Sequence, residues 1–146
     1  MNATMDMRAV IVPKSDQINA DDLISGPMNI TIREVRIKRG DEQPVDILFD
    51  GSDKFYRPCK SMSRALTEVW GFDAGKYIGK SLTLYRDPKV RFGKDQVGGI
   101  RISHMTDIPG EMIDSNGRVI LQLTVTRSQR KPHVIKPLVI EPEQDR

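Results

Sequence analysis

Hydrophobic and polar positions alternate along several stretches of the chain with the period of two that is typical of half-buried β-strands. The alternation is clear over residues 45–49, 82–85 and 100–103, and it is strongest over 119–126. Phe55 and Tyr56 lie in a shorter stretch that Pro58 ends. Turn-forming residues separate these stretches, so we predict one strand in each of them.

Residues 28–39 predict one long strand with an irregularity in its middle. Ile30 and Ile32 point to one face, whereas Val35 and Ile37 continue in the opposite phase. A change of phase inside a strand indicates a β-bulge or a sharp bend. We therefore expect a bent strand that belongs to two halves of a sheet at once.

One stretch has the spacing of an amphipathic α-helix, with apolar residues at i, i+3, i+4 and i+7. This stripe consists of Met62, Ala65, Leu66 and Val69. The predicted helix covers residues 61–70, with Ser61 as a candidate cap and Gly71 as its end. Trp70 borders the stripe, and we interpret it as a packing residue.

The order of predicted elements from about residue 28 to 104 is three strands, one helix and two strands. This order is typical of the five-stranded oligonucleotide-binding (OB) barrel, although other small α+β barrels share parts of it. We predict a mainly β fold with one helix, an OB-like barrel that is closed or nearly closed, and an extra C-terminal strand. The expected boundaries are an N-terminal arm at 1–27, the barrel domain with a basic extension at 28–138, and an acidic tail at 139–146.

Positive charge is concentrated between residues 76 and 104. This segment holds seven basic and two acidic residues, whereas the whole chain has a net charge of +3. A basic hairpin of this kind favours a phosphate-bearing partner. The alternative interpretation is that charged edge strands and loops keep the protein soluble. In an OB barrel the loop between the last two strands, here 87–96, flanks the binding face, which favours the nucleic-acid interpretation.

Single-strand binders on this fold combine a cationic groove with aromatic side chains on which bases stack. The candidate stacking residues are Tyr56, Tyr85 and Phe92, and each of them has core or rim packing as its alternative. The candidate phosphate contacts are Arg86, Lys89, Arg91, Lys94, Arg101, Arg127, Arg130 and Lys131. Phosphate contacts carry no sequence information, so we expect weak sequence preference.

The sequence contains no complete motif of a catalytic site. Residues 75–81 resemble the end of a P-loop, but the first glycine of that motif would fall at Ala74 and the order of elements is reversed. His104 and His133 have no motif partners. The single cysteine, Cys59, excludes an intramolecular disulfide and a multi-cysteine metal site, and a buried inert thiol is expected. We expect no enzyme activity, no metal and no cofactor.

The chain contains no apolar run of the roughly 20 residues that span a bilayer. Its first residues show no basic region followed by an apolar segment, so no secretory signal is expected. We expect the protein in the cytoplasm, without membrane contact.

Five segments resemble a family of small proteins encoded by bacteriophages and prophages. They are INADDLISGP, RPCKSMSRALTEVWG, YIGKSLTLYRDP, VRFGKDQVGGIRISHM and RKPHVIKPL, and together they cover roughly residues 18–138. The matching residues are Lys60, Trp70, Tyr85, Arg86, Asp87, Pro88, Gly93, Gly98, Gly99, Arg101, Ser103 and His104. The resemblance implies a phage protein made in a bacterial host, with a role in DNA replication or recombination, and it supplies no catalytic residue.

Three functions remain open from the sequence. The first is binding of single-stranded nucleic acid without catalysis. The second is binding and inhibition of a host protein, such as a component of a defence system. The third is a structural phage component that forms a defined multimer. A uniformly positive face favours nucleic acid, whereas a mixed or apolar patch favours a protein partner.

Overall fold

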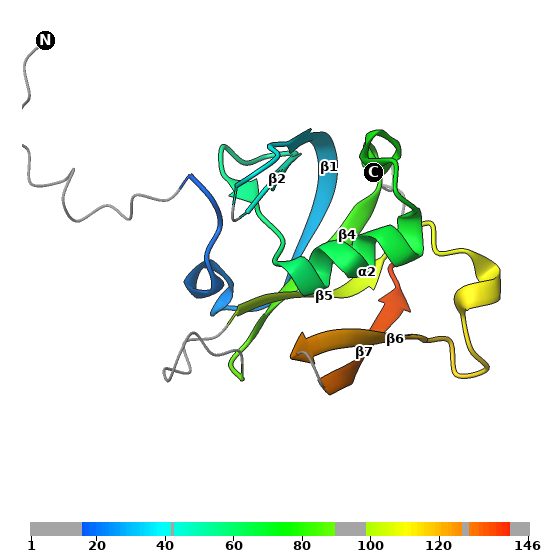
Figure 1. Cartoon of the computed structure of the whole chain (residues 1–146). Coiled ribbons are helices and arrows are strands. Elements are labelled where there is room, and N and C mark those ends of the chain that lie inside the picture. Colours follow the sequence, from blue (N-terminus) through cyan, green and yellow to red (C-terminus); the bar gives the residue numbers. More distant parts are fainter. Residues whose placement is uncertain (1–15, 42, 90–98, 127–128, 141–146) are drawn as a thin grey trace, which may run out of the picture.

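The computed structural model describes residues 16–41, 43–89, 99–126 and 129–140, and these form a mainly β fold with one α-helix (Figure 1). The elements in chain order are the 3₁₀ helix η1 (Ala20–Leu23), β1 (Met28–Ile37), β2 (Val45–Phe49), β3 (Phe55–Tyr56), α2 (Lys60–Trp70), the 3₁₀ helix η2 (Ala74–Tyr77), β4 (Ser81–Asp87), β5 (Gly99–Met105), the 3₁₀ helix η3 (Gly110–Met112), β6 (Val119–Thr126) and β7 (Gln129–Pro137). The predicted strands and the predicted helix are confirmed.

The seven strands form one mixed sheet in the order β3-β2-β1-β4-β5-β7-β6. All neighbours are antiparallel except β5 and β7, which pair in parallel over His104 and Met105. The sheet is open, so the prediction of a closed or nearly closed barrel is wrong. Two strands follow the first five instead of the single extra strand that we predicted, because residues 129–137 also pair.

The barrel stays open because another segment occupies the outer edge of β3. Gln17 pairs with Phe55 in parallel. The Ile18 amide donates to the Phe55 carbonyl at 2.8 Å, and the Phe55 amide donates to the Asp16 carbonyl at 2.9 Å. With this edge satisfied, β3 cannot form the ladder with β5 that would close the barrel. Nearby, Ile18 and Leu23 bury their side chains in the core.

The predicted irregularity in the first strand is confirmed. Residues 28–31 of β1 pair with β4 and residues 32–37 pair with β2, with a register shift between Ile32 and Glu34. Arg33 is therefore the extra residue of a β-bulge. Ile30 and Ile32 are buried and Val35 packs against the core, so the bulge brings apolar residues of both phases to the same face.

Helix α2 crosses in front of β4 and β5 in the view of Figure 1 and buries its apolar stripe in the core. The Ile102 amide donates to Met62 Sδ at 3.3 Å. The Trp70 indole donates to the Thr106 carbonyl at 2.8 Å, so Trp70 packs as predicted. Gly71 ends the helix with a φ of +90°, which is strained for residues other than glycine.

The predicted start of α2 is wrong by one residue. The helix begins at Lys60, and Cys59 occupies the N-cap position in place of Ser61. The Cys59 side chain makes no capping hydrogen bond. Thiols are weak hydrogen-bond acceptors, so the first turn lacks the side-chain oxygen that usually satisfies it.

The C-terminal hairpin joins the sheet through its second strand. Val119, Leu121 and Leu123 of β6 are buried, and Ile120 and Gln122 are exposed, as the alternation predicts. β7 meets the β5 ladder at Lys136 and Pro137 only. Further back along β7, His133 Nε2 donates to the Ile102 carbonyl at 2.6 Å and holds the two strands together.

We expect that shortening Leu66 to alanine destabilises the fold by about 2–5 kcal/mol, because the side chain is 2% exposed at the centre of the α2 stripe. Chemical denaturation measures this loss. Glu68→Ala on the exposed side of the same helix is the control and should change stability by less than about 0.5 kcal/mol. Equal effects of the two substitutions would contradict the packing of α2 on the sheet.

Candidate nucleic-acid interface

Basic side chains gather where β4 ends and where β5 and β7 begin. The end of β4 and the starts of β5 and β7 all lie in the lower half of the view in Figure 1. Parallel strands advance in step, so the pairing of His104 with Lys136 puts Lys131 level with Gly99. The described basic residues of this region, named here the basic end of the sheet, are Arg86, Lys89, Arg101, Arg130 and Lys131.

Tyr85 and Arg101 lie directly opposite each other on β4 and β5. Leu82 and Leu84 enter the core, so the half-buried Tyr85 ring faces the other side of the sheet, as predicted. Burial raises the pKa of Tyr85, and the Asp87 carboxylate acts in the same direction. A neutral phenol ring beside a guanidinium group offers both a stacking surface and a phosphate contact.

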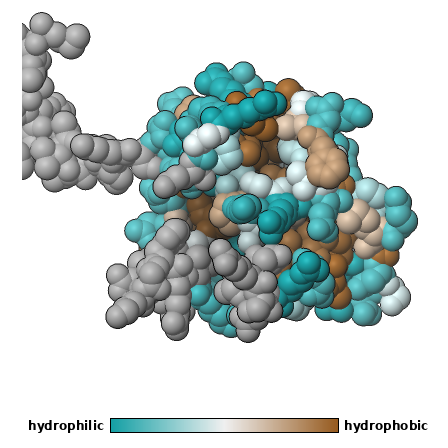
Figure 2. Space-filling model, in the orientation of Figure 1, coloured by the Kyte–Doolittle hydropathy of each residue, from teal (hydrophilic) through white to brown (hydrophobic). Residues whose placement is uncertain are grey.

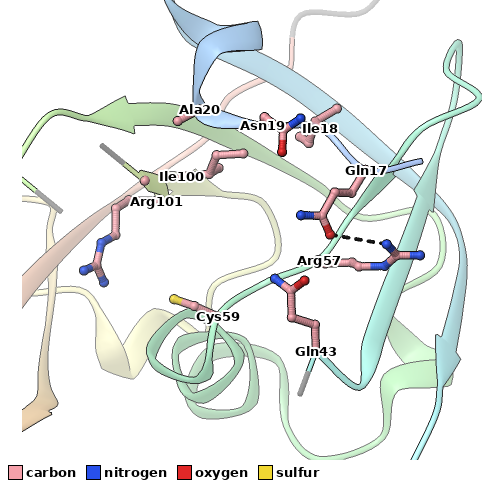
Figure 3. A pocket seen from close by; sticks show the side chains of 10 residues that line it. Gln17, Ile18, Asn19, Ala20, Gln43, Arg57, Cys59, Ile100 and Arg101 are labelled. Atoms are coloured by element: carbon pink, nitrogen blue, oxygen red, sulfur yellow. Dashed lines mark hydrogen bonds between the residues drawn. The ribbon is translucent and has the colours of Figure 1, made fainter. Parts of the chain in front are cut away.

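The open seam of the sheet holds a cavity of about 170 Å³, shown in Figure 3. Four parts of the chain line it: the segment that precedes and begins η1, the loop between β1 and β2, the connection from β3 into α2, and the start of β5. The lining residues are Gln17, Ile18, Asn19, Ala20, Gln43, Arg57, Cys59, Gly99, Ile100 and Arg101. In Figure 3, Arg57, Gln17 and Gln43 converge on one side, and Arg101 and Cys59 lie on the other.

Arg57 holds the occupied side of the seam together. Its Nη1 and Nη2 lie 2.6 and 3.0 Å from the Asp16 carboxylate, and its Nε lies 2.7 Å from Asp46 Oδ1. Lys38 Nζ lies 3.1 Å from the other oxygen of Asp46. Burial acts to raise the pKa of Asp46, but the hydrogen bonds from Arg57 and Lys38 outweigh it and hold the pKa below its usual value. The guanidinium group of Arg57 is thus engaged by protein carboxylates.

Two predictions about side chains in this region are wrong. Tyr56 is 1% exposed, so its ring packs in the core and no base can stack on it. The inward phase of the two-residue strand β3 explains this placement. Cys59 is exposed and lines the seam cavity, so it is not a buried thiol. Cys59 lies at the N-cap, before the first helical residue, and is therefore not part of the buried apolar stripe of α2.

Four of the predicted contact residues lie outside the described residues. They are Arg91, Phe92, Lys94 and Arg127. The structure brings together Tyr85, Arg86, Lys89 and Arg101 on one hairpin, with Arg130 and Lys131 on the neighbouring β7.

The sequence prediction missed the polar residues of the seam. Gln17, Gln43 and Arg57 come from three separate segments, and only the tertiary fold brings them around one cavity. One feature could have pointed to Arg57. Asp46 interrupts an apolar strand, and a buried carboxylate requires a cation close by.

Neither a metal-binding group nor a membrane-spanning helix is found in the described part of the chain. No three His, Cys, Asp or Glu side chains in it lie close enough to hold a metal ion. None of its helices is long and apolar enough to cross a membrane. No family model, curated protein or solved structure matches this chain.

The lowered pKa values of His104 and His133 predict that the free energy of unfolding decreases on mild acidification. Burial is the largest influence on the pKa of His133 and lowers it, although the hydrogen bond to the Ile102 carbonyl opposes this effect. Burial, followed by Lys136, lowers the pKa of His104. The unfolded chain therefore binds protons more readily than the folded protein, and stability falls as the pH drops below about 6.5.

Denaturation of the wild type, His133→Gln and the double variant His104→Gln/His133→Gln at pH 7.5 and 5.5 measures this effect. The wild type should lose the most free energy of unfolding, and the double variant should be nearly flat, because Asp16 and Asp46 titrate at lower pH. The same pH dependence in all three proteins would refute the role of the histidines.

Proposed function

We propose that the protein binds single-stranded nucleic acid without catalysis, along the basic end of the sheet. The observation that carries this proposal is the direct opposition of Tyr85 and Arg101, with Lys89, Arg130 and Lys131 exposed nearby. Following the resemblance of the sequence, we place this activity in a phage protein that acts in the cytoplasm of a bacterial host, in replication or recombination.

The strand pairings support an OB-like, open form of the fold. β1 pairs with both β2 and β4, β2 pairs with β3, β4 pairs with β5, and α2 stands between β3 and β4. The proposed surface includes the start of the loop after the fourth strand, which flanks the ligand face of OB folds together with the loop after the first strand. Gln43 of the first loop and Gly99 at the end of the second both line the seam cavity.

The charge distribution suits backbone recognition more than base readout. The exposed lysine and arginine side chains spread over three strand ends, where they can follow a flexible phosphate backbone. Asp87 is the acidic residue closest in sequence to this group, and its carboxylate accepts the Lys89 amide at 2.9 Å within the turn. Affinity should therefore depend strongly on salt and weakly on sequence.

Replacing Lys89, Arg130 and Lys131 together by glutamine tests the electrostatic part of the proposal. Fluorescence polarisation with labelled single-stranded DNA over a range of salt gives the slope of log K against log salt. Each lost phosphate contact should flatten this slope by about 0.7, so the triple variant should flatten it by about 2.

The matched control replaces Arg33, Arg64 and Lys76, three exposed basic residues outside this region, with the same change of net charge. Its slope should stay at the wild-type value. An equal loss in both triple variants would show that net charge alone drives binding. No binding of the wild type to single-stranded DNA or RNA at low salt would overturn the proposal.

Tyr85→Ala tests stacking separately from charge. Loss of one stacked base should weaken binding by about 1–3 kcal/mol while leaving the salt slope unchanged. Tyr85→Phe keeps the ring and should retain the affinity. If alanine and phenylalanine bind equally well, Tyr85 is a rim packing residue.

A second candidate is the binding of a host protein, such as a component of a defence system. The observation that favours it is the exposure of hydrophobic side chains, most of all Phe72 at 93% and Ile78 at 53%. Figure 2 shows apolar residues reaching the surface among polar ones. Under this second candidate, Phe72→Ser should leave the affinity for single-stranded nucleic acid unchanged. A loss of that affinity would show that the apolar surface contacts the nucleic acid.

A further inference from the structure

One outer edge of the sheet is covered and the other is bare. β3 and β6 are the two outermost strands. Gln17 pairs with Phe55 and covers the edge of β3, whereas no described segment pairs with the outer edge of β6. The hairpin of β6 and β7 lies at the lower side of Figure 1. An unpaired edge presents a row of amides and carbonyls with which another chain can pair.

The pairing of β7 shows which backbone groups of β6 face the bare edge. The Leu138 amide donates to the Met105 carbonyl at 2.8 Å, which turns the backbone groups of Leu138 toward β5. Backbone groups alternate in direction along a strand, so the even-numbered residues of β7 face β5 and the odd-numbered ones face β6. Pro132 agrees with this pattern, because its missing amide hydrogen then costs no bond between β6 and β7. The residues of β6 opposite the even-numbered ones therefore point their backbone groups outward, and they are Ile120, Gln122 and Thr124.

This edge lacks the features that usually prevent pairing with another chain, which are charged side chains, prolines and bulges. β6 contains no charged residue and no proline. Its register shift lies near its end, between Thr124 and Thr126. Ile120 is 47% exposed and lies opposite Val134, which is 37% exposed, so apolar side chains adjoin the edge. A bare, uncharged edge beside apolar side chains is suited to pairing with another strand.

We infer that β6 pairs with β6 of a second copy of the chain, antiparallel about a two-fold axis at Gln122. A two-fold interface uses the same residues on both copies. With Gln122 opposite Gln122 of the second copy, the three outward-facing residues pair only among themselves, Ile120 with Thr124. Each of these pairs exchanges two backbone hydrogen bonds. No other two-fold register pairs all three of them in this way.

The properties of β6 favour a second copy over a charged peptide. An uncharged strand opposes no like charge when it meets itself, and it offers no opposite charge to an acidic or basic segment. On the other face of the strand, Leu121 comes opposite Leu123 of the second copy. Both leucines are buried beside α2, so the pairing continues an apolar row of the core.

The assembly ends at two copies. A sheet with two bare edges would add copies without limit, but here Gln17 covers the edge of β3. Only β6 remains for pairing, and a two-fold axis uses it on both copies. This interface goes beyond the proposed function and does not rest on it.

Sedimentation velocity of the full-length protein without nucleic acid tests the interface. Over about a hundredfold range of concentration, the wild type should shift from monomer to dimer by mass action. Gln122→Lys and Gln122→Glu should each remain monomeric, because like charges meet at the axis. An equimolar mixture of the two variants should dimerise again. Gln122 is exposed, so both variants should keep the fold, which circular dichroism checks.

Phe72→Lys is the matched control, because it adds the same charge as Gln122→Lys at a site that is 93% exposed. This variant should dimerise like the wild type. A dimer that Phe72→Lys abolishes and Gln122→Lys preserves would place the interface elsewhere and overturn the inference. A wild type that stays monomeric over the whole range would also overturn it.

Disulfide trapping tests the register. Replacing Cys59, the single cysteine, by serine provides the background. In that background, Gln122→Cys should form a covalent dimer on mild oxidation, because paired Cα atoms lie about 5.5 Å apart, within disulfide range. Ile120→Cys should not, because four residues, or about 14 Å, separate it from its own copy. A covalent dimer of Ile120→Cys but not of Gln122→Cys would refute the pairing.

These measurements separate the interface from the proposed function. They contain no nucleic acid, so the absence of a dimer leaves strand binding at the basic end of the sheet untouched. A dimer that binds no single strand keeps the interface and refutes the proposed function.

Discussion

The pairing of the Asp16–Ile18 segment with β3 is the constraint on which the rest of the structure depends. Two backbone hydrogen bonds and the ion pairs of Arg57 with Asp16 and Asp46 fix this segment at the edge of the sheet. Asp46 is buried and forms ion pairs with Lys38 and Arg57, which compensate its negative charge where water is excluded. Once β3 is occupied, it cannot pair with the start of β5, and β7 pairs with the end of β5 instead, so the sheet stays open.

An open seam changes what the fold can do. It leaves Cys59 before α2, the start of β5 and the segment from Gln17 to Ala20 around one cavity, which a closed barrel would fill with a strand ladder. The same opening allows the β6–β7 hairpin to join β5 in parallel, with His133 completing the contact where the ladder ends. The basic end of the sheet and the seam cavity meet at Arg101.

The sequence predicted the elements well because their signals are local. The bulge in β1 follows from the phase change at Ile32 and Val35, and the buried face of α2 follows from its helical spacing. The open sheet could not be predicted, since it depends on a contact between Gln17 and Phe55 that no periodicity encodes. The burial of Tyr56 could not be predicted because β3 has only two residues, too few to show which of them points inward. Strand alternation indicated Tyr85, and the local concentration of charge indicated Arg101. The polar residues of the seam come from separate segments, so no local pattern indicated them.

The central claim is that a single strand binds at the basic end of the sheet. Amide chemical-shift mapping with a short unlabelled oligothymidine tests it most directly, because it reports position as well as binding. The account predicts that the largest shifts fall on Tyr85, Arg101, Arg130 and Lys131 and that they diminish with added salt. Shifts centred on Phe72 and Ile78, or no shifts at low salt, would contradict it.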